Sequence, residues 1–273
     1  MSKVIFITGA TKGFGKIWAE AFLKRGDRVV ATGRNAVALQ DLKQKYGDLV
    51  LPIPLDVNDR KASFEAVSKA KEHFGRIDVL INNAGYGLFG AVEETSEEEA
   101  RNQMETNFFG VLWLSQAVLP IMREQKSGHI IQVSSFLGLI TLPVLGLYNA
   151  SKFAVEGLSE TLASEVKGFG INVSLVEPNG YTTDWSGESA FQTKTIEAYN
   201  PVKAGFNEAV STPGIFGNPE ATAPVILKLI DNPNPPLRLL LGSFAYPAVK
   251  KVYEERLESF SEWKSVSDEA HGE

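Results

Sequence analysis

The chain has 273 residues, of which 44% are hydrophobic and 22% charged, and its formal net charge is -6. This composition is ordinary for a globular protein, and the negative charge argues against binding to a nucleic-acid backbone. The absence of cysteine excludes disulfides, thiol catalysis and cysteine metal sites. His73, His129 and His271 lack the spacing of a zinc site or a histidine-based triad, so we expect no metal.

No apolar stretch approaches the roughly 20 residues that a membrane helix needs. The N-terminus has one lysine, a short apolar run and then glycines, which is not the pattern of a signal peptide. We therefore expect a cytoplasmic protein with no membrane partner.

Short apolar runs alternate with longer amphipathic segments along most of the chain. The runs are mostly continuous, as expected for strands covered on both faces. They predict strands at Val4–Thr8, Arg28–Thr32, Leu49–Leu55, Ile77–Ile81, His129–Ser134, Ile171–Val176 and Leu237–Leu241. Helical patterns between them include Gly15–Arg25, Asp59–Phe74 and Ala150–Lys167. This alternation predicts an α/β fold, a Rossmann-type doubly wound parallel sheet of about seven strands with helices on both faces.

Three further segments complete the predicted single domain, which spans residues 1–273. Ser96 and Glu99 form a capping-box pattern that begins one long helix ending near Lys126–Gly128. Between about 179 and 219 the periodicity fades, which indicates a substrate lid. A C-terminal extension at about 243–273 contains one amphipathic helix followed by a polar end that we expect to fray.

The stretch "TGATKGFG" (Thr8–Gly15) lies directly after the first strand. It is not a P-loop, because five residues rather than four separate Gly9 from Gly15. It also departs from the G-x-G-x-x-G fingerprint, because Trp18 occupies the third glycine position. The remaining pattern, T-G-x-x-x-G-x-G, still allows a pyrophosphate to approach the start of a helix. The alternative is a glycine-rich turn without a ligand.

The second strand ends in "VVATGRN", where dinucleotide folds carry either an acidic residue for the ribose diol or an arginine for a 2′-phosphate. This chain has Arg34 there and no carboxylate, and Lys12 adds a second positive charge. The pattern favours NADP(H) over NAD(H). Alternatively, Arg34 is a solvated charge at the start of a helix.

Four more motifs follow in order along the chain: "NNAG" (Asn82–Gly85), "NFFG" (Asn107–Gly110), "VSSFLG" (Val133–Gly138) and "YNASK" (Tyr148–Lys152). Together with the glycine-rich turn, they resemble the short-chain dehydrogenase/reductase family, in its branch of roughly 250-residue enzymes. The resemblance extends from Lys3 to about Leu241 and is to the NADP(H)-preferring ketoreductases.

A tyrosine pKa near ~10 is too high for proton transfer at neutral pH. Lys152 lies one helical turn after Tyr148, and its ammonium favours the phenolate. The resemblance implies that Tyr148 is the general acid/base and that Lys152 lowers its pKa and binds the ribose. It further implies that Ser135 polarises the substrate carbonyl and that Asn107 holds a relay water. Ser134 is the rival serine, but the thirteen-residue spacing to the tyrosine favours Ser135.

The resemblance to the family also implies a set of residues at the cofactor. Asn179 replaces the glycine that usually follows Pro178, and we expect the turn to survive because asparagine tolerates positive φ. Thr183 occupies the position of the threonine that touches the nicotinamide carboxamide. Asp56 is expected near the adenine, or else caps the following helix. The full expected set is Gly9, Thr11, Lys12, Gly13, Phe14, Gly15, Arg34, Asp56, Val57, Asn83, Ala84, Gly85, Tyr148, Lys152, Pro178, Gly180 and Thr183.

The substrate side is expected to be mostly apolar, which predicts a neutral, hydrophobic ketone or aldehyde, although ordinary lid packing would produce the same composition. The candidate substrate residues are Tyr86, Ser135, Phe136, Leu142, Leu145, Tyr181 and Trp185, with Leu137, Val144 and Phe191 beside them. The resemblance also implies a homodimer or homotetramer formed through the helices near Ser96–Arg123 and Tyr148–Lys167.

Three functions stay open on the sequence. The first is an NADPH-dependent carbonyl reductase. The second is an NAD-dependent, steroid- or retinol-like alcohol dehydrogenase acting oxidatively. The third is a catalytically silent dinucleotide sensor, although such proteins tend to lack the tyrosine or the lysine, and both are present here. An extended epimerase or dehydratase relative would show a shorter glycine spacing and a larger C-terminal domain.

Overall fold

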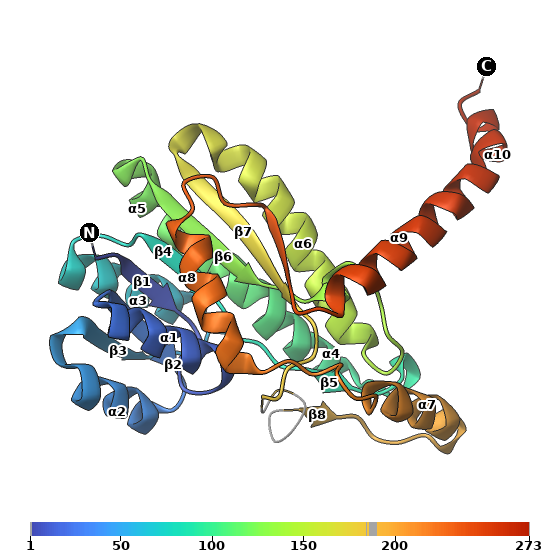
Figure 1. Ribbon diagram of the computed structural model, residues 1–273, viewed down its shortest axis with the longest axis horizontal. Coiled ribbons are helices and arrows are strands. Elements are labelled where there is room, and N and C mark those ends of the chain that lie inside the picture. The colour runs from blue at the N-terminus through green and yellow to red at the C-terminus, as the bar shows by residue number, and fades with distance from the viewer. Residues whose placement is uncertain (1, 184, 186–189, 273) are drawn as a thin grey trace.

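The computed structural model describes residues 2–183, 185 and 190–272. Its centre is a seven-stranded sheet in the order β3-β2-β1-β4-β6-β7-β9 (Figure 1). All neighbouring strands are parallel, which confirms the predicted Rossmann-type fold. The strands are β1 (Val4–Ile7), β2 (Arg28–Gly33), β3 (Val50–Pro54), β4 (Val79–Asn82), β6 (Gly128–Val133), β7 (Ile171–Pro178) and β9 (Arg238–Leu241).

Helices cover both faces of the sheet, because side chains alternate along each strand. In β1, Ile5 and Ile7 point into one core, and Val4 and Phe6 point into the other. The first core is closed by α1 (Gly13–Arg25), α2 (Ala36–Tyr46) and α8 (Ala223–Asp231). The second is closed by α3 (Arg60–Phe74), α5 (Gly110–Gln125) and α6 (Gly146–Val166). The strand order reverses between β1 and β4, so the loops after these strands diverge and leave the crevice where such folds bind ligands.

The predicted long helix is interrupted. The capping box is confirmed, since the Ser96 hydroxyl accepts from the Glu99 N–H at 3.2 Å and Glu99 accepts from the Ser96 N–H at 2.8 Å. The segment then divides into α4 (Glu97–Met104), a π-helical turn η3 (Glu105–Phe109) and α5. The Gly110 N–H donates to the Glu105 carbonyl five residues earlier. Residue propensities do not reveal such a turn.

The predicted lid at 179–219 contains more regular structure than its sequence indicates, and residues 184 and 186–189 of it lie outside the described part. A short strand, β8 (Phe191–Gln192), pairs with β5 (Leu88–Phe89). The helix α7 (Asn200–Val210) follows. Lys203 of α7 forms an ion pair of 2.7 Å with buried Glu94, so this segment is fixed to the body by a specific contact.

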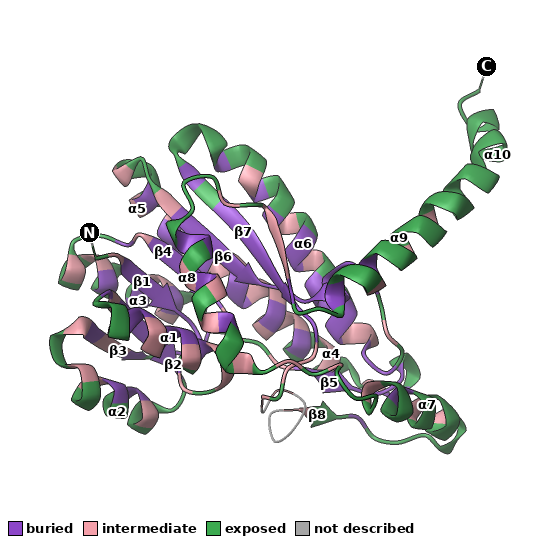
Figure 2. Ribbon diagram, in the orientation of Figure 1, coloured by how far each residue is buried: buried purple, intermediate pink, exposed green. Residues whose placement is uncertain are grey.

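The C-terminal extension projects away from the body as α9 (Ala245–Glu262) and α10 (Lys264–Glu269) (Figure 1). The prediction of a frayed polar end is wrong, because the chain stays helical to Glu269, with an ion pair between Lys264 and Asp268. Figure 2 shows that the outer part of this projection is exposed on all sides. No helix within the described ranges is long and apolar enough to cross a membrane.

Candidate active site

The glycine-rich turn has the geometry of an anion cradle. Gly9 and Gly13 have positive φ values of 65° and 52°, which only glycine adopts without cost. A Cβ on Gly15 would lie 2.2 Å from the Gly9 carbonyl oxygen, whereas a Cβ on Gly13 would meet, among the described residues, only Thr183, at 4.0 Å. The helix α1 starts at Gly13 without a side-chain cap and without an acidic residue in its first turn. Its first N–H groups therefore fit the pyrophosphate of a dinucleotide.

A hydrogen-bond network fixes this turn to the end of β4. The Asn83 side-chain amide donates to the carbonyl of Thr8 at 2.8 Å and to that of Gly9 at 3.3 Å. The backbone N–H groups of Asn83 and Ala84 both donate to the Thr8 hydroxyl at 2.9 Å. Thr8 was not among the predicted site residues. The sequence did contain a clue to its role, because Thr8 is the threonine that begins the T-G-x-x-x-G-x-G pattern.

Arg34 follows β2 and is exposed. Within the described part of the chain it forms no hydrogen bond or ion pair. Burial raises the pKa of the Tyr86 hydroxyl, and the positive charge of Arg34 opposes that rise. Arg34 is therefore near enough to the crevice for its charge to be felt at Tyr86. Thr11 packs against the end of β2, since a Cβ on Gly33 would lie 3.0 Å from its methyl group. Thr11, which follows β1, and Arg34, which follows β2, thus lie at the same edge of the sheet, as expected for residues that contact one cofactor.

Asp56 does not cap the helix that follows it. Its carboxylate accepts from the Asn58 N–H at 3.0 Å, and the N-cap of α3 is Asp59, which accepts from the Ala62 N–H at 2.9 Å. That alternative was therefore wrong. Val57 packs directly beside α5, where a Cβ on Gly110 would lie 2.8 Å from it.

The four predicted catalytic residues are all buried, and contacts connect them. Tyr148 and Lys152 lie in the first two turns of α6, with the Lys152 Nζ 5.7 Å from the centre of the tyrosine ring. The Ser135 hydroxyl accepts from the Leu137 N–H at 3.1 Å and donates to the Pro178 carbonyl at 3.4 Å, and it lies close enough to the Tyr148 hydroxyl to act on its pKa. Lys152 Nζ donates to the Val133 carbonyl at 2.8 Å. The structure thus brings the predicted serine, tyrosine and lysine together at the ends of β6 and β7.

Burial acts in opposite directions on the two titratable groups. It raises the pKa of Tyr148 well above its ordinary value, and the nearby Ser135 hydroxyl opposes this rise. It lowers the pKa of Lys152 to about 8, and the carboxylate of Glu156 opposes this fall. At neutral pH the tyrosine is therefore protonated and the lysine is mostly charged.

Asn107 lies inside the π-helical turn and holds the loop after β4. Its amide oxygen accepts from the Tyr86 N–H at 3.1 Å, and its amide nitrogen donates to the Tyr86 carbonyl and the Ser151 hydroxyl, both at 3.1 Å. A Cβ on Gly85 would lie 3.1 Å from this amide oxygen and 3.7 Å from Lys152 Nζ. Asn107 is therefore next to the lysine, and its binding of a relay water stays a prediction.

Apolar side chains surround Tyr148 on the predicted substrate side. Trp185 packs edge-on against its ring, with the ring centres 4.8 Å apart, and also against Phe89. The cluster contains the predicted residues Phe136, Leu137, Val144 and Leu145, with Leu142 and Trp185 at its margin.

One predicted aromatic residue lies elsewhere. Tyr181 packs against Phe14 of the glycine-rich turn, with ring centres 5.1 Å apart, rather than joining the cluster around Tyr148. Tyr86 contacts Phe191, another predicted substrate-side residue, at 4.9 Å between ring centres, and the neighbouring Gly87 packs against Trp185.

The turn after Pro178 is stabilised by side-chain hydrogen bonds and not, as predicted, by a positive φ at Asn179. Asn179 does not adopt positive φ. Its side-chain amide donates to the carbonyls of Gly180 and Ile215, both at 2.8 Å. These bonds tie the turn to the far end of the lid segment and keep Thr183 beside Gly13.

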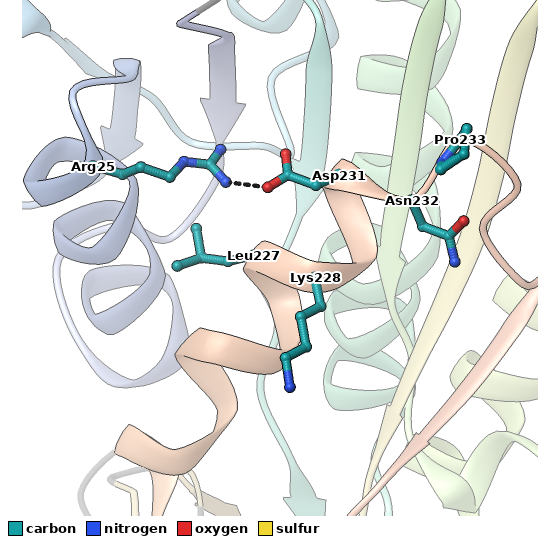
Figure 3. Close-up of a pocket in the computed structure, with 6 residues that line it drawn as sticks. All are labelled: Arg25, Leu227, Lys228, Asp231, Asn232 and Pro233. Atoms are coloured by element: carbon teal, nitrogen blue, oxygen red, sulfur yellow. Dashed lines mark hydrogen bonds and ion pairs between the residues drawn. The ribbon is translucent and has the colours of Figure 1, made fainter.

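A surface cavity of about 540 Å³ lies away from this edge, between the end of α1 and α8. Figure 3 shows Arg25 directed at Asp231 across it, in an ion pair of 2.7 Å. None of the residues lining it belongs to the predicted site. It is an ion-paired corner of the scaffold.

Comparison with known proteins agrees with this geometry. The model of the short chain dehydrogenase family matches residues 3–193. The chain belongs to this family. It is 43% identical over 270 residues to oxidoreductase BOA17 of Botryotinia fuckeliana, covering 98% of each chain. It is 39% identical over 243 residues to a 3-ketodihydrosphingosine reductase of Bacteroides thetaiotaomicron, covering 88% of each.

Solved structures of short-chain dehydrogenases show the same fold. One from Streptomyces avermitilis has a TM-score of 0.91 at 38% identity and covers 98% of both chains. One from Burkholderia phymatum in complex with NAD has a TM-score of 0.80 at 27% identity, covering 95% and 94%. One from Burkholderia cenocepacia in complex with NADP has a TM-score of 0.77 at 26% identity, covering 96% and 97%. The chain is therefore an oxidoreductase of a family whose members bind NAD or NADP.

Proposed function

We propose that this short-chain dehydrogenase is an NADPH-dependent carbonyl reductase that acts on a neutral, hydrophobic ketone or aldehyde, or on the corresponding alcohol in reverse. One observation carries the proposal. Tyr148 is buried, close to the Ser135 hydroxyl and one helical turn before Lys152, at the same edge of the sheet as the glycine-rich turn.

When bound, the nicotinamide cofactor supplies the hydride. Tyr148 then donates its proton to the alkoxide oxygen, and its raised pKa keeps that proton in place until the reaction begins. Ser135 donates a hydrogen bond to the same oxygen and polarises the carbonyl. The ammonium of Lys152 stabilises the phenolate that remains.

The proposed cofactor contacts follow the predicted set. The turn from Gly9 to Gly15 holds the pyrophosphate, Lys152 binds the ribose and Thr183 binds the carboxamide. Arg34 and Lys12 bind the 2′-phosphate, which favours NADPH. The exposure of Arg34 and its lack of a partner among the described residues support this assignment.

The apolar cluster around Tyr148 supports a hydrophobic substrate, since it contains Phe136, Leu145 and Trp185. The 39% identity to a protein named 3-ketodihydrosphingosine reductase supports a ketone. We also propose that the protein is cytoplasmic and forms a homodimer or homotetramer through α4, α5 and α6.

A panel of ketones and aldehydes followed by NADPH absorbance tests the reaction. Tyr148→Phe is expected to lower kcat by about 10²–10⁴-fold while NADPH binding, measured by fluorescence titration, stays unchanged. Retained turnover in this variant would refute the assigned mechanism. NADPH binding without turnover of any carbonyl compound would instead favour the silent sensor.

Comparison of NADPH with NADH tests the cofactor. Arg34→Ala is expected to raise KM for NADPH by about 10–100-fold, the loss of one hydrogen bond to a charged group. KM for NADH is expected to stay the same. A wild-type preference for NADH would support the alternative, an NAD-dependent alcohol dehydrogenase acting oxidatively.

A further inference from the structure

Two buried carboxyl groups lie beneath the proposed site, and the reaction described above does not use them. Glu156 lies one helical turn after Lys152 on α6, and Glu177 lies on β7 with none of its surface exposed. Both approach the same guanidinium. The Arg238 Nε is 3.1 Å from a Glu156 oxygen and 3.6 Å from a Glu177 oxygen.

The charges around this pair balance only if one carboxyl group is protonated. Arg238 and Lys152 supply two positive charges, and Glu160, which pairs with Arg238 at 2.8 Å near the surface, supplies one negative charge. Glu156 supplies a second negative charge. Ionised Glu177 would add a third without a cation to match it. The 3₁₀ turn η4 (Phe136–Gly138), which also packs against α6, carries no titratable side chain.

The proton belongs on Glu177. In the described part of the chain, neither of its oxygens receives a hydrogen bond from a conventional donor. Burial raises the pKa of Glu177, and the charge of Glu156 raises it further. Burial also raises the pKa of Glu156, but Ser134, Arg238 and Glu177 all oppose that rise. Protonated Glu177 can donate to Glu156, which then stays ionised.

Glu156 is adjacent to the proposed catalytic groups. A Cβ on Gly138 would lie 2.8 Å from the Ser134 hydroxyl and 3.0 Å from the Glu156 Cγ, so the backbone at Gly138 packs directly against Ser134 and Glu156. The carboxylate of Glu156 raises the pKa of Lys152 against the effect of burial. Its influence on the reaction therefore passes through the lysine.

We propose that Glu156 is a positioning residue whose carboxylate, kept ionised by Arg238 and by a proton on Glu177, holds Lys152 in its ammonium form and sets the upper pH limit of the reaction. This inference rests on the proposed function and adds a group to its site. Loss of the ammonium at high pH removes the stabilisation of the Tyr148 phenolate, so carbonyl reduction falls as the pH rises through the pKa of the lysine.

The pH profile of kcat/KM for carbonyl reduction tests this. Glu156→Gln keeps the shape of the side chain and removes its charge. The apparent pKa of the high-pH limb of the profile is therefore expected to fall by about one unit. Glu156→Asp is expected to restore the limb at least in part. Glu160→Gln is the matched control, because it changes another carboxylate on Arg238 from the same helix and should leave the limb unmoved. Glu177→Gln should also leave it unmoved, because the amide donates as the protonated acid does.

Two measurements test the roles of Glu156 and Glu177 without an assay of enzymatic activity. Lysine-selective NMR titration of the full chain is expected to show a lower pKa for Lys152 in Glu156→Gln than in the wild type. Infrared difference spectra between the wild type and Glu177→Gln are expected to show a protonated carboxylic acid at neutral pH. An unchanged lysine pKa, or the absence of that acid band, would overturn the proposal even if the carbonyl reductase is confirmed. If no carbonyl compound is reduced, both measurements still stand and only the proposed function fails.

Discussion

The two halves of the crevice are stabilised in different ways. At the ends of β1 and β4, backbone groups are paired and glycines allow close contacts, as in the bonds between Thr8 and Asn83. At the ends of β6 and β7 lie the side chains of the proposed chemistry, and among the described residues several buried polar atoms there have no conventional partner, including those of Ser134 and Glu177. The first half suits a ligand held by backbone geometry, as the proposed pyrophosphate would be. The second suits a reaction that depends on pKa values, as the proposed proton transfer does.

The largest expected effect is in the first half. A methyl group on Gly15 would lie 2.2 Å from the Gly9 carbonyl oxygen, so Gly15→Ala is expected to destabilise the chain by about 3 kcal/mol and to abolish NADPH binding. Urea unfolding and fluorescence titration measure these effects. Gly157→Ala is the control, because no atom lies within 4 Å of the added Cβ and the substitution favours helix by about 0.5–1 kcal/mol. Equal stability of the two variants would contradict the comparison.

A smaller effect is expected where a single hydroxyl holds the two loops together. Thr8→Ala leaves the backbone N–H groups of Asn83 and Ala84 without their acceptor, and is expected to cost about 2 kcal/mol. Thr8→Ser keeps the hydroxyl and should keep most of the stability. Thermal unfolding of the three chains measures the difference. A loss in the serine variant as large as in the alanine variant would show that the methyl group matters, not the hydrogen bonds.

The smallest expected effect is in the second half. Trp185→Ala removes one aromatic contact with Tyr148 and one with Phe89, and we expect it to raise KM for a hydrophobic ketone by about fivefold, equivalent to roughly 1 kcal/mol. The Tm should barely change. Trp185→Phe, which keeps an aromatic ring, serves as the control. A change in Tm comparable with that of Gly15→Ala would mean that this half also depends on fixed packing.

Most of the scaffold follows from the sequence because buried parallel strands are continuously apolar. The seven strands of the central sheet were predicted, and so was the capping box of Ser96 and Glu99, whereas the short strands β5 and β8 were not. Short-range patterns failed where tertiary contacts decide the structure. The helix α7 is tied to the body by the ion pair between Lys203 and Glu94, which are more than a hundred residues apart in the chain. The extension is a different case, because its exposed i, i+4 charge pairs are local and each adds only a little to its helicity.

The proposed catalytic residues could be selected from the sequence because they fall in motifs at strand and helix ends, and the structure places Ser135, Tyr148 and Lys152 close to one another; their catalytic roles stay a prediction. The buried carboxyl pair was not predicted, because Glu156 and Glu177 are distant in sequence and their effect depends on mutual proximity and burial. The position of Tyr181 was missed for a similar reason. Its ring packs on Phe14 across the crevice, a contact that no local pattern encodes.

The π-helical turn at Glu105–Phe109 sets the phase of the helix that follows it. One extra residue in that turn rotates everything after it by about 100° relative to an uninterrupted α-helix. With this rotation, Val111, Leu114 and Val118 of α5 are buried, while the Asn107 amide reaches Tyr86 and the Ser151 hydroxyl of α6. The one extra residue of the π-helical turn therefore sets both the position of the Asn107 amide and the packing of α5. A deletion there would misalign the buried stripe of α5, even though every side chain it needs would still be present.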